Sequence, residues 1–164
     1  MSKQASFRWV FVFAALLSAG FLAAALALEH LGGMEPCPLC WVQRWAYTLV
    51  GAVALLALIH RPGPVGARIY GGALGVSAVA GLLVAARHIQ VQLSPPTIGC
   101  GVGWSTMMER LPFHELLLRA MEGSAECAQV DAFLGVPLPW WTGGGYAAIA
   151  FLGLAVATGA LRSR

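Results

Sequence analysis

Four long apolar runs, separated by polar breaks, dominate the pattern of this sequence. A membrane-spanning helix needs about 20 predominantly apolar residues, and each run comes close to that length. The runs cover residues 9–28, 41–59, 69–86 and 140–161. The pattern therefore predicts an all-α membrane protein, a bundle of four transmembrane helices, in which residues 1–164 form a single domain.

The polar breaks between the runs differ in length. Residues 29–40 form a short loop, residues 60–68 form a tight turn rich in Pro and Gly, and residues 87–139 form a long loop. Glycines such as Gly71 and Gly153 lie within the third and fourth runs. Small residues let membrane helices approach closely, so we expect these helices to pack through their glycines.

Composition agrees with a membrane protein. Of the residues, 59% are hydrophobic and only 10% are charged, and the mean hydropathy is +0.74. A soluble domain carries about 25% charged residues, so this chain cannot cover its surface with charge. The formal net charge of +3 is too small to indicate binding to nucleic acid.

The charges distinguish the two sides of the predicted bundle. One side holds six basic residues and no acidic one: Lys3, Arg8, Arg61, Arg68, Arg162 and Arg164. The other side holds three arginines and all seven acidic residues: Arg87, Arg110, Arg119, Glu29, Glu35, Glu109, Glu115, Glu122, Glu126 and Asp131. Because cytoplasmic loops carry an excess of Lys and Arg, we expect both termini and the tight turn in the cytoplasm. The short and long loops then face outward.

Each outward loop contains two cysteines. Cys37 and Cys40 lie in the short loop, and Cys100 and Cys127 lie in the long loop. Thiols confined to an oxidising compartment indicate disulfide chemistry. Three interpretations are open: two structural disulfides, a relay of two exchanging thiol pairs, or a zinc site. The zinc site is the weakest, because only the first pair has the compact CxxC spacing that zinc favours.

The surroundings of Cys40 favour the relay. The thiolate is the reactive form of cysteine, and helix N-termini and nearby cations stabilise it. Cys40 stands at the start of the second run, and Arg44 follows at i+4, on the same helical face one turn deeper. Pro38 stiffens the segment between the two sulfurs. We therefore expect the helix end and the guanidinium to stabilise a Cys40 thiolate.

Insertion of a charged residue such as Arg44 into a membrane helix costs about 2.5–3.5 kcal/mol of free energy at the bilayer centre and less near the interface. Its side chain either extends to the lipid headgroups or meets a group that becomes negative. A membrane quinone fits the second interpretation, because its oxygens gain charge as it accepts electrons and a cation placed beforehand stabilises that charge. The sequence has neither the CxxCH motif of haem attachment nor the GxGxxG motif of dinucleotide binding.

His88 is expected at the same depth as Cys40 and Arg44, at the outer end of the third run. A histidine at this depth can form a hydrogen bond with a quinone oxygen or supply a proton. The alternative is an ordinary histidine at the membrane interface. We therefore include His88 as a candidate quinone-binding residue.

Two segments resemble a known family. CPLCWVQR, followed by a long outer loop with two separated cysteines, closely resembles the DsbB family of bacterial disulfide bond formation proteins. ECAQVDAFLGVPLPWW is similar to the family's segment that leads from its last cysteine into the fourth helix. The resemblance implies a quinone-dependent thiol oxidase of the bacterial inner membrane. Such an enzyme reoxidises DsbA, a soluble thioredoxin-fold oxidant of the periplasm.

The resemblance also implies how the cysteines pair. Cys100 and Cys127 would form the disulfide that meets the DsbA-like partner, while Cys37 and Cys40 would pass electrons to ubiquinone or menaquinone. We expect the partner to attack Cys100, because it lies in the glycine-rich segment TIGCGVG. Cys127 would then reduce the first pair by thiol–disulfide exchange.

The resemblance also implies roles for Arg44 and His88, which match family residues close to the quinone. Gln43 stands where a relative can carry an acid, so no role in proton transfer is assigned to it. The stretch PFHELLLRAM in the long loop has apolar residues at helical spacing. We expect a short surface helix there, either flat on the membrane or packed on the bundle.

Two other classes of protein remain as alternatives. A vitamin-K-epoxide-reductase-like enzyme also combines four helices, a CxxC motif and a quinone, although it usually places the motif late in the bundle. A membrane scaffold with two structural disulfides would have no enzymatic activity. Depletion of quinone separates the scaffold from a relay, because only a relay would then accumulate thiols.

Overall fold

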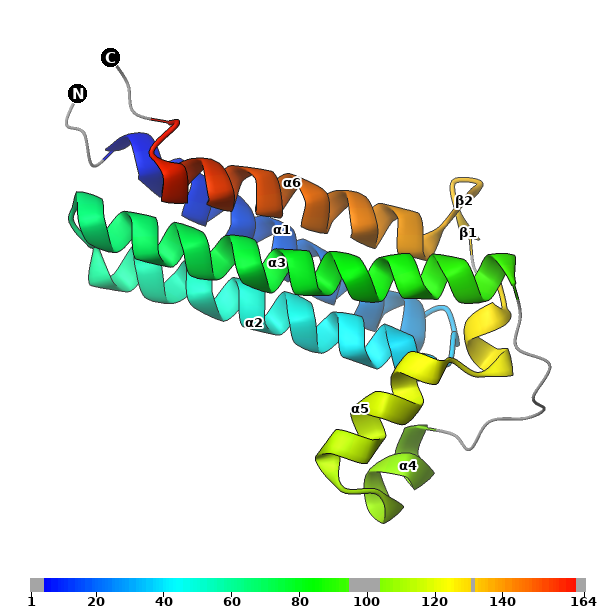
Figure 1. Ribbon diagram of the computed structural model, residues 1–164. Helices are drawn as coiled ribbons and strands as arrows, with labels where there is room; N and C mark the ends of the chain where they lie inside the picture. The colour runs from blue at the N-terminus through cyan, green and yellow to red at the C-terminus, as the bar shows by residue number, and fades with distance from the viewer. Residues whose placement is uncertain (1–4, 95–103, 131, 162–164) are drawn as a thin grey trace.

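A computed structural model of the chain describes residues 5–94, 104–130 and 132–161. Within these residues, four long helices run side by side (Figure 1). They are α1 (Ala5–His30), α2 (Pro38–His60), α3 (Pro64–Leu93) and α6 (Leu138–Thr158). Each of them is long and apolar enough to cross a membrane. The predicted all-α bundle of four transmembrane helices is confirmed.

Some residues that the sequence singles out lie outside the described part of the chain. Cys100 is one of them, and its predicted pairing with Cys127 therefore stays a prediction. The others are charged residues near the two termini and in the long loop: Lys3, Asp131, Arg162 and Arg164.

Proline lies in the first turn of three of the four long helices. Pro38 and Pro64 are the first residues of α2 and α3, and α6 has Pro139 in its first turn. Proline suits this position because its missing N–H would have no partner inside the helix and its φ is already helical. The helix α3 continues to Leu93, so His88 lies within a regular helix.

Glycines bring α3 and α6 into close contact. A Cβ atom on Gly153 would lie 2.8 Å from the backbone nitrogen of Gly75, and one on Gly71 would lie 2.9 Å from the carbonyl oxygen of Gly153. No larger residue fits without a shift of the backbone. The expected packing of helices through these glycines is confirmed.

Shorter elements occupy the long loop between α3 and α6. Two helices, α4 and α5, project from the side of the bundle near the beginning of α2 (Figure 1). A short 3-10 helix, η1, and a hairpin of two strands follow them. The bounds are α4 (Trp104–Arg110), α5 (Phe113–Glu122), η1 (Ala125–Ala128), β1 (Ala132–Phe133) and β2 (Val136–Pro137). The hairpin turns through Leu134 and Gly135, whose φ angles of 54° and 79° suit a type I′ turn.

The helix α5 packs on the bundle through one face. Leu116 and Ala120 are buried in a cluster that also contains Val42 of α2 and Trp104 of α4. Phe113 at the start of α5 remains 63% exposed. The predicted short surface helix is thus present, and the described contacts support packing on the bundle.

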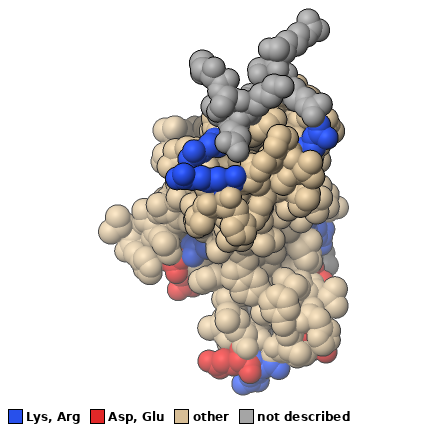
Figure 2. Space-filling view, turned by 90° about the vertical axis from the view of Figure 1, so that its left-hand side faces the viewer, with Lys and Arg blue, Asp and Glu red and all other residues tan. Residues whose placement is uncertain are grey.

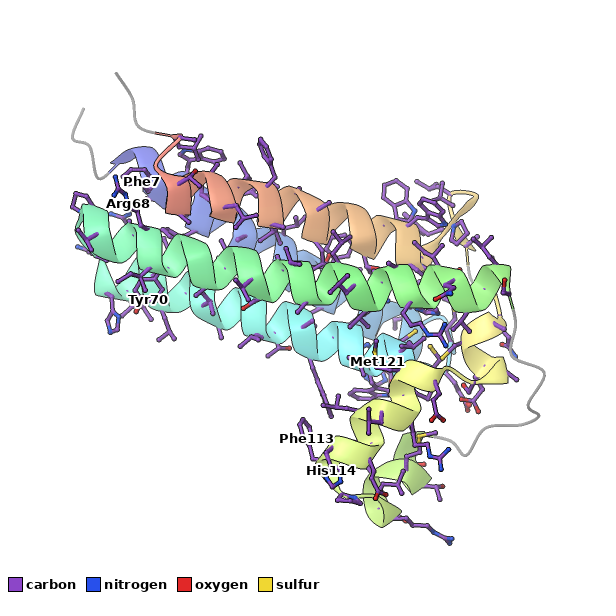
Figure 3. The ribbon with its side chains drawn as sticks, in the orientation of Figure 1. Phe7, Arg68, Tyr70, Phe113, His114 and Met121 are labelled. Atoms are coloured by element: carbon purple, nitrogen blue, oxygen red, sulfur yellow. The ribbon has the colours of Figure 1, made fainter. Side chains whose placement is uncertain are left out.

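Side-chain contacts hold the end of α5 against α3. The guanidinium of Arg87 donates to the backbone carbonyls of Met121 and Glu122, each over 2.9 Å. Figure 3 shows Met121 at the junction with the bundle, while Phe113 and His114 lie at the opposite end of α5. This anchor directs the following segment, η1, back toward the bundle.

The two ends of the bundle differ in charge. Figure 2 looks onto the end of the bundle where α1 begins and α6 ends, and arginine side chains gather there. The acidic side chains visible in this view lie away from that cluster, partly on the α4–α5 projection. The described basic residues at this end are Arg8, Arg61 and Arg68. This separation agrees with the expected cytoplasmic position of the termini, which stays a prediction.

Candidate functional site

The CxxC segment forms the beginning of α2. Cys37 is the N-cap residue, and its sulfur accepts a hydrogen bond from the backbone N–H of Cys40 over 3.3 Å. The two sulfurs are 2.9 Å apart, farther than the roughly 2.05 Å of a disulfide bond. Cys40 thus lies in the first helical turn, where unpaired N–H groups provide a partial positive charge.

Cys127 lies against the CxxC pair although it is distant in sequence. The short helix η1 places it in a buried cluster with Cys37, Leu39 and Val91. Its side chain packs beside Cys37 in this cluster, and the Ser124 hydroxyl donates to Cys127 Sγ over 3.6 Å. One thiol of the long loop therefore contacts the pair of the short loop.

The neighbouring thiols and burial favour a proton on Cys37. The pKa of Cys37 is raised by its hydrogen bonds with Cys127 and Cys40 and by burial. The pKa of Cys127 is lowered to about 6, chiefly by the hydrogen bond from Cys37 and despite burial. Backbone hydrogen bonds at Leu39 and Ser124 lower it further. At neutral pH, Cys127 is therefore a thiolate that faces a protonated Cys37.

His88 reaches the CxxC pair from α3. Its Nε2 lies 3.8 Å from Cys37 Sγ, and its Nδ1 lies 3.2 Å from the side-chain nitrogen of Gln43. The Thr142 hydroxyl donates to Gln43 Oε1 over 2.9 Å, so the Gln43 amide nitrogen is the donor to His88. The proton of the neutral imidazole then resides on Nε2 and faces the Cys37 sulfur.

Arg44 is fixed inside the protein by α1. Its Nη1 pairs with the Glu29 carboxylate, and its Nη2 donates to the carbonyl oxygen of Ala25 over 3.2 Å. The guanidinium carbon also lies 5.1 Å from the centre of the Trp41 ring, within the range of a cation–π interaction. These contacts do not fit an arginine that merely extends to the lipid headgroups.

An apolar pocket of about 450 Å³ lies beside Cys40 and Arg44. Side chains of α1 and α6, among them Phe21 and Trp141, contribute to its walls. Small-molecule sites typically have volumes of about 300–1,000 Å³ and a few polar groups. The polar side chains that line this pocket are those of Glu29, Glu35, Cys40, Gln43, Arg44, Tyr47, His88 and Thr142.

A second cavity, of about 730 Å³, lies at the same end of the bundle. It has a more polar lining, which includes Glu126 of η1, Gln129 at the end of η1 and also Cys37. Cys40 and His88 line both the cavity and the apolar pocket. Cys40 therefore stands at the boundary between a polar space and an apolar one.

Comparison with known proteins identifies the family. The family profile described as "Disulfide bond formation protein DsbB" matches residues 7–160. This chain belongs to the DsbB family. The match covers most of the chain, so the resemblance noted in the sequence is confirmed.

Individual relatives of the DsbB family agree with this assignment. A disulfide bond formation protein B of Alkalilimnicola ehrlichii is 47% identical over 130 residues, which cover 79% of this chain and 80% of the relative. The protein of the same name in Marinobacter nauticus is 43% identical over 152 residues, covering 91% and 90%. That of Azoarcus sp. is 41% identical over 155 residues, covering 93% and 91%. No solved structure matches this chain.

The family assignment favours thiol oxidation over the vitamin-K-epoxide-reductase-like and scaffold alternatives. A metal site needs separate consideration, because the ligand atoms of Cys37, Cys40 and His88 lie within 4.8 Å of one another. A metal would need a free lone pair on His88 Nε2. The contact with Gln43 instead leaves the proton on that nitrogen, so the arrangement suits hydrogen bonding to sulfur.

Sequence reasoning missed two polar groups of this DsbB-family site. In the sequence, Glu29 is only one of the acidic residues on the outward side, and nothing indicates that it pairs with Arg44. Thr142 looked like a neutral residue of the fourth run, yet it orients Gln43. Both roles depend on contacts between helices, which no spacing along the chain could indicate.

Proposed function

We propose that this DsbB-family membrane thiol oxidase passes electrons from the Cys100–Cys127 pair, through Cys37 and Cys40, to a quinone in the apolar pocket. It thereby reoxidises a DsbA-like protein of the periplasm. One observation carries the proposal: Cys127 contacts Cys37 at a point where the neighbouring Cys40 lines the pocket that also contains Arg44.

The first exchange brings electrons into the long loop. The dithiol of the partner reduces the Cys100–Cys127 disulfide, with Cys100 as the sulfur attacked and Cys127 released as a thiolate. The low pKa of Cys127, about 6, keeps it in the reactive form at neutral pH. No electron leaves the proteins in this step, because one disulfide is exchanged for another.

The second exchange moves the electrons to the pocket. The Cys127 thiolate attacks the sulfur of Cys37, so a Cys37–Cys127 bond forms as the Cys37–Cys40 bond breaks. Cys40 leaves as a thiolate, which the beginning of α2 and the guanidinium of Arg44 stabilise. Cys100 then attacks Cys127, which restores the loop disulfide and leaves both thiols of the CxxC pair reduced.

The pocket has the properties that a quinone requires. Its walls are mostly apolar, it lies beside a membrane-spanning helix, and it holds the cation of Arg44 within an interior that strengthens electrostatic interactions. A bound quinone would act as the two-electron acceptor. Arg44 would stabilise the negative charge that develops on the ring, and His88 would line the same pocket. We expect ubiquinone or menaquinone in this role.

The charge distribution supports an orientation in the inner membrane. The basic end of the bundle, with both termini, would face the cytoplasm, and the cysteine end would face the periplasm. Electrons would then enter from the periplasmic side and leave into the lipid.

A cross-linking experiment tests the proposed exchange. The double variant Cys40→Ser/Cys100→Ser retains Cys37 and Cys127, which should form a disulfide on mild oxidation because their thiols are in contact. Peptide mapping under non-reducing conditions detects the Cys37–Cys127 bond.

The matched control is Cys37→Ser/Cys100→Ser, which retains Cys40 and Cys127. This pair should cross-link distinctly more slowly, since Cys37 and Cys127 are both buried in one cluster, whereas Cys40 only packs against it. Equal rates in the two variants, or no bond in the first, would contradict the proposed route.

A further inference from the structure

Glu29 lies at the quinone pocket without a role in the thiol relay. It is in the last turn of α1, one turn beyond Ala25, and these two residues bind the two terminal nitrogens of Arg44. The side chain of Glu29 is 24% exposed and that of Arg44 is 13% exposed. Glu29 is therefore a partly hydrated carboxylate that is bound to a largely buried cation.

Glu29 also faces two different environments. It lines the apolar pocket beside Cys40, and it lines the outer cavity of about 730 Å³. Gln92 and Glu126 contribute to the polar lining of that cavity. A proton taken up on the cavity side could thus reach the apolar pocket by rotation of a single side chain.

The other polar side chains of the pocket are poorly suited to carry a proton. Gln43 does not ionise, and both ring nitrogens of His88 are engaged. The hydroxyl of Tyr47 donates to a backbone carbonyl over 2.8 Å. Glu35 is exposed and, among the described residues, makes no hydrogen bond or ion pair. Of the described acids that line the pocket, Glu29 is the one that contacts the arginine.

We propose that Glu29 is a proton carrier for the quinone pocket: it takes a proton from water in the outer cavity and donates it to the reduced ring. The inference rests on the proposed function, because it requires a quinone in the pocket. Its physical basis is competition for the single cation of Arg44. As charge develops on the ring, the guanidinium turns toward it and releases the Glu29 carboxylate, which lies between the polar cavity and the apolar pocket.

Electrons, protons and charge balance in this step. Before oxidation, Cys37 carries its proton and Cys40 is a thiolate. Closure of the Cys37–Cys40 disulfide releases two electrons and the one proton of Cys37. The quinone takes up two electrons and two protons, so it needs one more proton, and Glu29 delivers this proton from water.

Variants of Glu29 test the proposal in detergent-purified full-length protein with a short-chain ubiquinone. Glu29→Gln should lower the turnover number of quinone reduction about 100-fold, a typical loss when a general acid is removed. Quinone binding, measured by quenching of tryptophan fluorescence, should remain close to that of the unmodified protein. Glu29→Asp, which retains an acid, should reduce quinone faster than Glu29→Gln. Glu109→Gln, which replaces an exposed acid of α4 that lines neither cavity, is the control and should behave as the unmodified protein.

Chemical rescue separates proton transfer from the positioning of Arg44. Added acetate should accelerate quinone reduction by Glu29→Ala, because it can bring a proton, whereas chloride at equal ionic strength should not. Equal effects of the two anions, or a loss of rate in Glu29→Gln that parallels a loss of quinone binding, would overturn the proposal. So would quinone reduction by Glu29→Gln at the unmodified rate.

The same experiments distinguish a failure of the proposed function from a failure of this inference. If the unmodified protein does not reduce quinone in the presence of a reduced thioredoxin-fold partner, the function itself is wrong and the inference falls with it. If the unmodified protein reduces quinone and the Glu29 variants do so equally well, only the role of Glu29 is rejected.

Discussion

Contacts from α1 hold the guanidinium of Arg44 beside the apolar pocket. Its position one turn after Cys40, inside an apolar run, is enough to suggest a functional charge. Its partners, Glu29 and the carbonyl of Ala25, come from another helix and depend on how α1 and α2 pack. The same holds for His88, whose place at the outer end of a helix could be predicted, while its contacts with Cys37 and Gln43 could not.

Replacement of Arg44 should affect the quinone and spare the partner. Arg44→Ala removes a cation, and a hydrogen bond to a charged group contributes about 1.5–3 kcal/mol. The KM for quinone should therefore rise at least about tenfold. Exchange between the long-loop cysteines and a DsbA-like partner should stay largely intact. Steady-state kinetics with varied quinone give the first value, and a stopped-flow exchange assay gives the second.

The matched control for Arg44 is Arg119→Ala. Arg119 is an exposed arginine of α5 whose ion pair with Glu122 lies at the surface, where such pairs contribute little. Quinone kinetics that are the same for Arg44→Ala and Arg119→Ala would exclude Arg44 from the quinone site.

The reactivity of Cys127 should depend on its neighbour Cys37. With a pKa of about 6, Cys127 in the reduced protein should react with iodoacetamide down to about pH 6, and the rate should fall below that pH as the thiolate is protonated. In Cys37→Ala the main cause of the low pKa is removed, so the midpoint should move to higher pH. Mass spectrometry of the alkylated peptide measures the rate at this one site. An unchanged midpoint would show that Cys37 does not stabilise the thiolate.

At the scale of elements, the long apolar runs predict the four main helices well, because burial in a bilayer demands a continuous helix. The elements of the long loop are less predictable. The helix α4 has 7 residues and is held by packing of Trp104 against Trp41 and Trp45, with ring centres 5.9 Å and 5.3 Å apart. The hairpin depends on a turn at Leu134 and Gly135, two residues that give no strong sequence signal.

Close packing of α3 and α6 should depend on Gly153. Gly153→Ala places a methyl group against the backbone of Gly75 and Gly71, and such overpacking typically costs about 1–3 kcal/mol. Gly144→Ala is the control, because a Cβ there meets nothing within 4 Å. Thermal unfolding in detergent should show a lower midpoint for Gly153→Ala and no loss for Gly144→Ala. Equal midpoints for the two variants would show that the packing of α3 against α6 does not depend on Gly153.

At the scale of the whole molecule, the fold brings two spaces to one end of the bundle with Cys40 between them. In the proposed function, thiol exchange takes place at Cys37, which lines the polar cavity. Electron transfer takes place beside the apolar pocket, which Arg44 lines. The sequence indicates that all four cysteines share one side of the membrane, but not that η1 returns Cys127 to the CxxC pair. That contact joins segments separated by four helices, α2 to α5, and depends on the anchor between Arg87 and the end of α5.

The most direct test of the account follows quinone absorbance in a mixture of purified protein, short-chain quinone and a reduced DsbA-like dithiol protein. Quinone should be reduced in proportion to the dithiol oxidised, one molecule for each disulfide formed, and Cys40→Ser should abolish the reaction although it still binds quinone. Quinone reduction by Cys40→Ser at the unmodified rate, or oxidation of the dithiol without any loss of quinone, would contradict the account.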